Sequence, residues 1–173
     1  MKAQILNPFL EAIQEVLVKE VRAEITRGEL SLDNSPYITE DVTTLISMIG
    51  QVEGNVLFSM SQDTAKAVVS RMLGETVTAF DGLAQSGISE LGNVIVGQAS
   101  VRLARAGYQT NISPPALIQG DGAQLSTLDY PRLVVPLMTE IGMITVHLAL
   151  KESTGTYQPG EQIGTPQKPQ VDS

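Results

Sequence analysis

The fold is decided by one stretch, residues 86–106, which reads SGISELGNVIVGQASVRLARA. At about 100° of rotation per residue, its apolar residues recur on one side, which predicts a long amphipathic helix. That side carries Ile88, Leu91, Ile95, Ala99, Arg102 and Ala106. All of them except the long-stemmed Arg102 are apolar, so we expect this side of the helix to face the core.

The other side of the predicted helix is small and polar. It carries Ser86, Glu90, Asn93, Gly97, Val101 and Ala104. Residues three apart on a helix are neighbours, about 5–6 Å apart at Cβ, so Glu90 and Asn93 present a carboxylate and a carboxamide together. We expect both side chains to be largely solvent-accessible, on a face that another surface can approach closely.

Two glycines weaken this helix and leave two explanations open. Gly92 and Gly97 each cost about 1 kcal/mol relative to alanine in a helix interior. The glycines either permit close packing of another element, with Glu90 and Asn93 merely solvated, or they belong to a functional site. A bare Glu-x-x-Asn pattern occurs often by chance, so the spacing alone favours the first explanation.

An earlier helix is predicted near the start of the chain. Pro8 fits an opening helical turn, Asn7 is a candidate cap, and apolar residues recur at helical spacing up to Gly28. Residues 29–40 show no period, so we expect them to be irregular.

The helix predicted between these two, the second along the chain, has the clearest boundaries. Ser61 is its predicted N-cap and Gly74 its C-terminal glycine. Asp81 is a further candidate cap, which would start the long helix near Gly82 rather than at Ser86.

Runs of β-branched and alternating apolar residues predict strands. The runs cover residues 42–50, 55–60, 108–112, 116–119, 130–139 and 142–150. The first two form a hairpin around residues 51–54, and the last two form the strongest hairpin. Pro136 indicates an edge strand or a bulge in that hairpin, because proline donates no ladder hydrogen bond. Together these elements predict an α+β (α/β two-layer) fold, with long helices packed on one face of a mainly antiparallel sheet.

The length and the composition suit one domain. The chain has 173 residues, and we place the domain at residues 1–151. Residues 152–173 are mostly Gly, Pro, Gln, Thr and Ser, so we expect a disordered C-terminal tail. The start of the chain is too polar for a secretory signal, and no apolar run approaches the roughly 20 residues of a membrane span. We therefore expect a cytoplasmic protein that does not contact membranes.

The composition also excludes several kinds of site. The chain has no cysteine and one histidine, which rules out thiol nucleophiles, cysteine-based zinc sites and histidine clusters, so we expect no metal site. His147 has no nucleophile or acid beside it in sequence, so we expect it to be either structural or solvated and assign it no catalytic role. Asp121 and Asp129 lie among turn residues, where aspartate ordinarily bonds locally. A net charge of −8 makes nucleic acid a poor partner.

A family resemblance rests on the residues around Glu90 and Asn93. The pattern S-x-x-x-E-L-x-N-x-x-x-G-x-A resembles the signature helix of the CheC/CheX/FliY phosphatases of bacterial chemotaxis. Further matching segments are NPF at 7–9, EGNV at 53–56, FSMS at 58–61, MLG at 72–74, SPP at 113–115 and VVP at 134–136. A single Glu-x-x-Asn helix in one compact domain is most similar to CheX. Glu11 and Gln14 form a degenerate echo of the pattern, for which a solvated helix face is the favoured explanation.

The resemblance implies a phosphatase that removes the aspartyl phosphate of a phosphorylated CheY-type response regulator. Asn93 would insert and orient the attacking water, since a carboxamide can accept one hydrogen bond while donating another. Glu90 would pair with the lysine that response regulators keep beside their phosphorylation site, and Ser86 and Gly97 would be partner-binding positions. The resemblance implies no cofactor on this chain and Mg²⁺ on the regulator. It further implies a homodimer, for which an exposed strand edge offers a route.

Two other hypotheses keep the same helix but not the enzyme. A non-enzymatic regulator-binding or scaffold module would retain the contact face without turnover of phosphate. A purely structural dimerisation domain would use the helix for packing and would have no affinity for a regulator.

Overall fold

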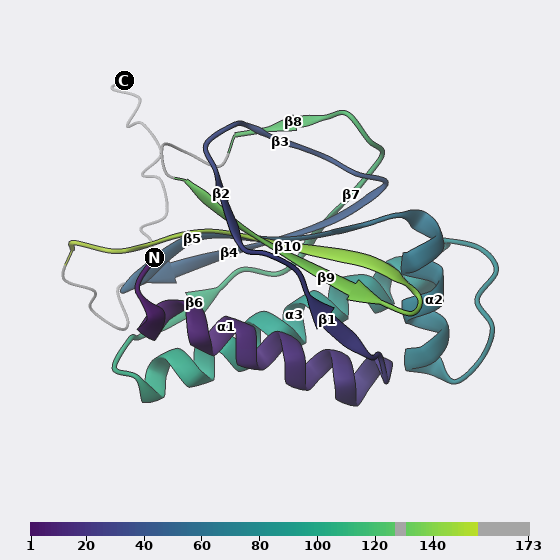
Figure 1. Cartoon of the computed structure of the whole chain (residues 1–173), viewed down its shortest axis with the longest axis horizontal. Helices are drawn as coiled ribbons and strands as arrows, with labels where there is room; N and C mark the ends of the chain where they lie inside the picture. Colours follow the sequence, from purple (N-terminus) through teal and green to yellow (C-terminus); the bar gives the residue numbers. More distant parts are fainter. Residues whose placement is uncertain (127–130, 156–173) are drawn as a thin grey trace, which may run out of the picture.

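Helices cover one face of a large antiparallel sheet (Figure 1). The computed structural model of the chain describes residues 1–126 and 131–155. The strands of the sheet are β1 (Ile25–Arg27), β2 (Ser31–Asp33), β4 (Val42–Gly50), β5 (Val52–Met60), β6 (Thr110–Ile112), β7 (Ala116–Gln119), β9 (Arg132–Thr139) and β10 (Gly142–Glu152). Their order is β1-β9-β10-β5-β4-β6, with β2 also paired to β9 and β7 to β4. The predicted α+β fold is confirmed.

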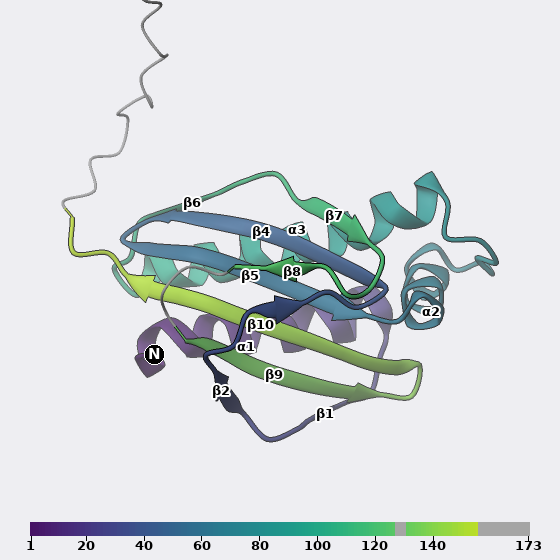
Figure 2. The same cartoon turned by 90° about the horizontal axis from the view of Figure 1, so that it is seen from above.

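In the described ranges, three α-helices flank this sheet. The helices α1 (Ala3–Val16) and α3 (Gly82–Arg105) lie side by side on one face, and α2 (Gln62–Leu73) lies at one end. Seen from the other face, α1 and α3 lie behind the strands (Figure 2). The buried side chains between these layers include Phe9, Ile13, Val56, Phe58, Ile88, Leu91, Ile95, Ala99, Val146 and Leu148. The predicted core side of α3 is therefore buried over most of its length, although Arg102 and Ala106 are not buried.

The predicted boundaries of α2 and the early start of α3 are confirmed by their caps. The Ser61 hydroxyl accepts a hydrogen bond from the Thr64 backbone N–H at 3.1 Å. Gly74 ends α2 in the left-handed conformation, with φ of 71°. The Asp81 carboxylate accepts from the Ala84 backbone N–H at 3.2 Å, so α3 begins at Gly82.

The predicted limits of the first helix are wrong at both ends. The helix begins at Ala3, with Pro8 inside it, because Ile5 and Phe9 are buried and tertiary packing holds the early turns in place. It widens into a π-helical turn at Leu17–Val21 and stops at Arg22, whose φ is 55°. A left-handed arginine carries no sequence signal comparable to a glycine.

The predicted turn at residues 51–54 is also too long. The strand β5 already starts at Val52, and Gly54 lies within the ladder opposite Met48 and Leu150. A Cβ atom on Gly54 would lie 2.0 Å from the Ala149 carbonyl oxygen, and its φ is 136°. This glycine therefore serves the close approach of β10 and does not form a turn.

Pro136 does not lie on an edge strand, but the expected irregularity lies beside it, since the register against β9 shifts by one residue between β1 and β2. The strand β9 has β10 on one side and the short strands β1 and β2 on the other. Those two strands are separated near Gly28, whose N–H donates to the Pro136 carbonyl at 2.8 Å. The N and O atoms of one strand residue face the same side, so the proline nitrogen lies where the neighbouring strand is interrupted. Residues 29–40 accordingly contain strands and are not wholly irregular.

A polar cluster lies on the sheet face away from α1 and α3. The small pair β3 (Tyr37–Ile38) and β8 (Gln124–Leu125) crosses over this face (Figure 1). Beneath it, the buried Arg132 donates from Nε to His147 Nδ1 at 3.2 Å and from Nη2 to Asp33 Oδ2 at 2.7 Å. The Tyr37 ring meets the His147 ring edge-on at 4.8 Å. His147 is therefore a buried structural residue, and the solvated alternative that the sequence left open is wrong.

Several predictions fall near or on residues that lie outside the described ranges. Glu152 still belongs to β10, and the Ser153 N–H donates to the Gln51 carbonyl at 2.9 Å. Most of the predicted tail, residues 156–173, lies outside the described residues, and so does Asp129. Asp121 is exposed in a bend.

We predict that His147 makes stability depend on pH. Burial, and then the Arg132 guanidinium, lower the pKa of His147 from 6.5 to about 4. The unfolded chain therefore binds more protons than the folded chain between these values, so the free energy of unfolding falls as the pH falls through this window. We expect a loss of about 2 kcal/mol between pH 7.5 and pH 5. Urea denaturation across this range should show it.

The matched variant for this prediction is His147→Gln. Glutamine can accept the Arg132 hydrogen bond but does not titrate, and the chain has no other histidine. The variant should lose most of the slope above pH 5. An equal slope in both proteins would contradict the prediction.

Candidate functional site

The predicted site residues lie together on the outer side of α3. Ser86 and Glu90 are exposed, while Asn93 and Gly97 are partly exposed. We call the outer side of this helix the α3 strip, which consists of Leu83, Ser86, Glu90, Asn93, Gly97 and Val101. The elements that position it are the capped start of α3 and the packing of the helix against the sheet and α1.

The Glu90 carboxylate and the Asn93 carboxamide are both available for contacts with another molecule. In residues 1–126 and 131–155, neither side chain has a hydrogen-bond or ion-pair partner within the chain. An unpartnered acid and amide one helical turn apart can bind a cation and a water or amide group on an incoming surface.

Asn93 is less exposed than we expected, and its position on the helix explains the difference. It lies about two turns before Ser100, whose hydroxyl is 2.8 Å from the Thr110 hydroxyl on β6. Asn93 therefore lies at the border between the α3 strip and the side of the helix that faces β6. Glu90 is exposed as expected.

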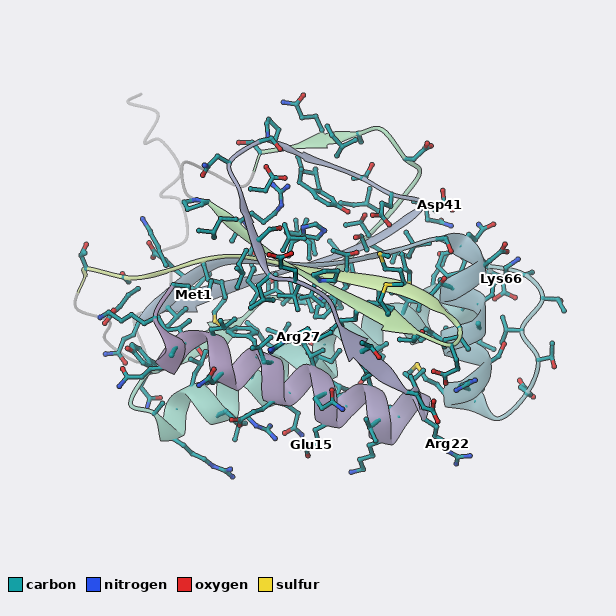
Figure 3. All side chains as sticks on the ribbon, in the orientation of Figure 1. Met1, Glu15, Arg22, Arg27, Asp41 and Lys66 are labelled. Carbon is teal, nitrogen blue, oxygen red and sulfur yellow. The ribbon has the colours of Figure 1, made fainter. Side chains whose placement is uncertain are left out.

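The degenerate pattern on α1, Glu11 and Gln14, differs from Glu90 and Asn93 in the charges beside its carboxylate. Glu11 lies 3.5 Å from Arg102 Nε, and Glu15 pairs with Nη2 of the same guanidinium. Figure 3 labels Glu15 on α1. The one charged residue on the core side of the predicted helix thus joins α1 to α3. The carboxylate at Glu11 is already engaged, which distinguishes Glu11 and Gln14 from Glu90 and Asn93.

The two glycines of α3 have different explanations. A Cβ atom on Gly92 would lie 3.2 Å from Thr44 Cγ2 and 3.4 Å from Phe58 Cδ2, so Gly92 permits close packing on the sheet. Among residues 1–126 and 131–155, a Cβ atom on Gly97 would meet nothing within 4 Å. Packing against these residues explains Gly92 and does not explain Gly97.

Glu90 and Asn93 lie on an exposed helix face, away from the two cavities that the described residues enclose most clearly. An enclosed apolar cavity of about 10 Å³ lies beneath α3, and an open groove of about 730 Å³ lies between α1 and β1. Neither Glu90 nor Asn93 lines them. Small substrates ordinarily bind in concave sites, so this face suits a macromolecular surface.

Neither a metal cluster nor a membrane-spanning helix emerges in the part of the chain that the structure describes. There, no three His, Cys, Asp or Glu side chains gather in a way that could hold a metal ion. None of the helices in the same ranges combines the length and the apolar character needed to span a bilayer.

Sequence reasoning missed the positions or roles of two residues of α3. Leu83 precedes the stretch from which the prediction started, although its spacing of seven residues from Glu90 places it on the same side of the helix. The role of Arg102 was also missed. Its signal is the acidic pair Glu11 and Glu15, four residues apart on α1.

This chain is similar in sequence to proteins described as CheX. The family model of the chemotaxis phosphatase CheX matches residues 42–138. A CheY-P phosphatase CheX of Thermotoga maritima is 32% identical over 121 residues, which cover 69% of this chain and 78% of that relative.

Solved structures of this description have the same fold. A chemotaxis protein CheX from Desulfovibrio desulfuricans has a TM-score of 0.76 and 25% identity, covering 86% of this chain and 99% of that chain. A chain of the CheX–CheY–BeF3–Mg²⁺ complex from Borrelia burgdorferi has a TM-score of 0.75 and 28% identity, covering 85% of this chain and 97% of that chain. This chain therefore belongs to the CheX family of chemotaxis phosphatases.

Proposed function

We propose that this chain dephosphorylates a phosphorylated CheY-type response regulator. The observation that supports it is the Glu90–Asn93 pair, which has no side-chain partner among the described residues and lies on a helix face outside the two cavities described above. Two relatives support the proposal: the Thermotoga maritima CheX is a CheY-P phosphatase, and the Borrelia burgdorferi CheX forms a complex with CheY, BeF3 and Mg²⁺. The direct test is phosphate loss from a panel of phosphorylated response regulators, with and without this protein. No acceleration on any regulator would contradict the proposal.

Asn93 is the proposed catalytic residue. Hydrolysis of an acyl phosphate by in-line attack of water needs positioning more than covalent chemistry. A carboxamide can accept a hydrogen bond from the attacking water and donate another to a neighbouring oxygen. The regulator supplies the aspartyl phosphate and its Mg²⁺, and this chain supplies the amide.

Glu90 is the proposed docking contact. Its carboxylate would pair with the lysine beside the phosphorylation site and so fix the depth to which Asn93 enters. Ser86 and Gly97 are the proposed close-approach positions, since neither places a bulky side chain between the two surfaces. This arrangement needs no titratable group on this chain to change its charge.

The alternatives differ in measurable properties. A non-enzymatic regulator-binding module would bind the regulator and leave the phosphate in place. A structural dimerisation domain would bind no regulator, and changes at Glu90 would alter self-association instead.

We also propose that the protein is a homodimer, as the family resemblance implies. Both edges of the sheet carry short strands, β1 and β2 at one edge and β6 and β7 at the other. Short edge strands limit pairing between the sheets of two copies. The homodimer proposal therefore rests mainly on the family resemblance and less on the exposed strand edges. Light scattering should give about twice the chain mass of 18.5 kDa. A purely monomeric protein at high concentration would contradict it.

We predict that Asn93→Ala and Glu90→Ala fail in different ways. Removing one preorganised polar group should lower turnover about 10²-fold or more and leave regulator affinity unchanged. Removing the docking charge should lower affinity and make it less dependent on salt. Phosphate release and regulator binding, each measured at two salt concentrations, separate the two effects. Full activity of Asn93→Ala would contradict the enzymatic assignment.

We predict opposite results when leucine replaces each glycine of α3. Gly97→Leu should keep or raise the free energy of unfolding, because the site is open and leucine favours a helix, yet it should block regulator docking. Gly92→Leu should lower the free energy of unfolding by about 1–3 kcal/mol or more, because the side chain would overpack the contact with Thr44 and Phe58. Urea denaturation and the phosphatase assay measure both properties. Normal activity of Gly97→Leu would exclude Gly97 from the docking surface.

A further inference from the structure

Two large apolar residues of α3 are exposed, and both lie on the α3 strip. Leu83 has an exposed fraction of 57% and Val101 of 51%, whereas Ile88, Leu91 and Ile95 are buried. Leu83 lies seven residues before Glu90 and Val101 eleven residues after it. At about 100° of rotation per residue, the side chains of Leu83 and Val101 leave the helix within about 20° of the direction of the Glu90 side chain.

The described part of the chain does not cover these two side chains. Leu83 and Val101 are absent from the apolar core, which includes other leucine and valine residues of the same helix. Single exposed apolar residues need no explanation. Here, however, two of them lie at the two ends of the α3 strip, on either side of Glu90 and Asn93.

We propose that Leu83 and Val101 are the apolar contacts by which the response regulator docks on α3. The inference rests on the proposed function, and it adds the residues that supply affinity for the response regulator. At 1.5 Å per residue, Ser86 to Gly97 spans about 17 Å, and the addition of Leu83 and Val101 extends the contact to about 27 Å. The regulator would then present apolar side chains on both sides of its phosphorylation site.

Magnitudes favour an apolar contribution to docking. An exposed ion pair such as that proposed for Glu90 changes affinity by about fivefold or less. Burial of a leucine side chain changes affinity by roughly ten- to a hundredfold. A helix face with one charge and several small residues therefore gains most of its affinity from Leu83 and Val101. A regulator is the occupant we choose, because a relative of similar fold is seen in complex with CheY, BeF3 and Mg²⁺.

The test uses Leu83→Ser and Val101→Ser, with Leu32→Ser as the matched control. Leu32 is 63% exposed on β2, which lies across the molecule from α3 (Figure 2). We expect each α3 variant to raise the KM for the phosphorylated regulator about tenfold, with kcat at saturation and the melting temperature unchanged. We expect the same loss in binding to a regulator activated with BeF3 and Mg²⁺, whereas Leu32→Ser should match the unmodified protein.

The outcomes separate this inference from the proposed function. If Leu83→Ser and Val101→Ser behave like Leu32→Ser while the unmodified protein dephosphorylates the regulator, the docking inference is wrong and the phosphatase proposal stands. If the protein binds the activated regulator through Leu83 and Val101 without turnover, the docking inference stands and the phosphatase proposal fails. If the α3 variants change the molecular mass in light scattering and leave regulator binding intact, the strip contacts a second copy and the docking inference is wrong.

Discussion

The rotation of α3 about its own axis is fixed by its close contact with the sheet at Gly92. The missing side chain lets the helix backbone approach Thr44 on β4 and Phe58 on β5. A slip of one residue would rotate the helix by about 100° and carry Glu90 away from its outward direction. The exposure of the candidate site is therefore a consequence of a packing contact on the other side of the same helix.

Arg102 provides a second constraint on this helix and separates two similar sequence patterns. Its guanidinium contacts both Glu11 and Glu15, which ties α1 to α3 and occupies the carboxylate of the degenerate pattern. Glu90 forms no such ion pair in the described part of the chain. The difference between a candidate site and its echo thus lies in the neighbouring charges as well as in the spacing of the acid and the amide.

Local signals in the sequence predicted α2, α3 and the final hairpin, because caps, apolar periodicity and glycine stops act within a few residues. The failures involve distant contacts. Gly54 resembles a turn glycine in sequence, yet it is required by the Ala149 carbonyl of another strand. The strands β1 and β2 have three residues each and exist through pairing with β9. The end of α1 depends on a left-handed Arg22, which the apolar spacing does not indicate.

The unequal exposure of the two site residues matches their proposed roles. Asn93 is partly covered, and a partly covered side chain has fewer accessible rotamers, so it loses less entropy when it is fixed in a complex. A group that orients water must be held within a narrow range of positions, because misplacement of the reacting atoms slows the reaction steeply. Glu90 is exposed, and a docking charge acts over a longer range and tolerates a mobile side chain. The border position of Asn93, which sequence periodicity alone does not distinguish from the centre of the strip, is therefore the more suitable place for a water-positioning amide.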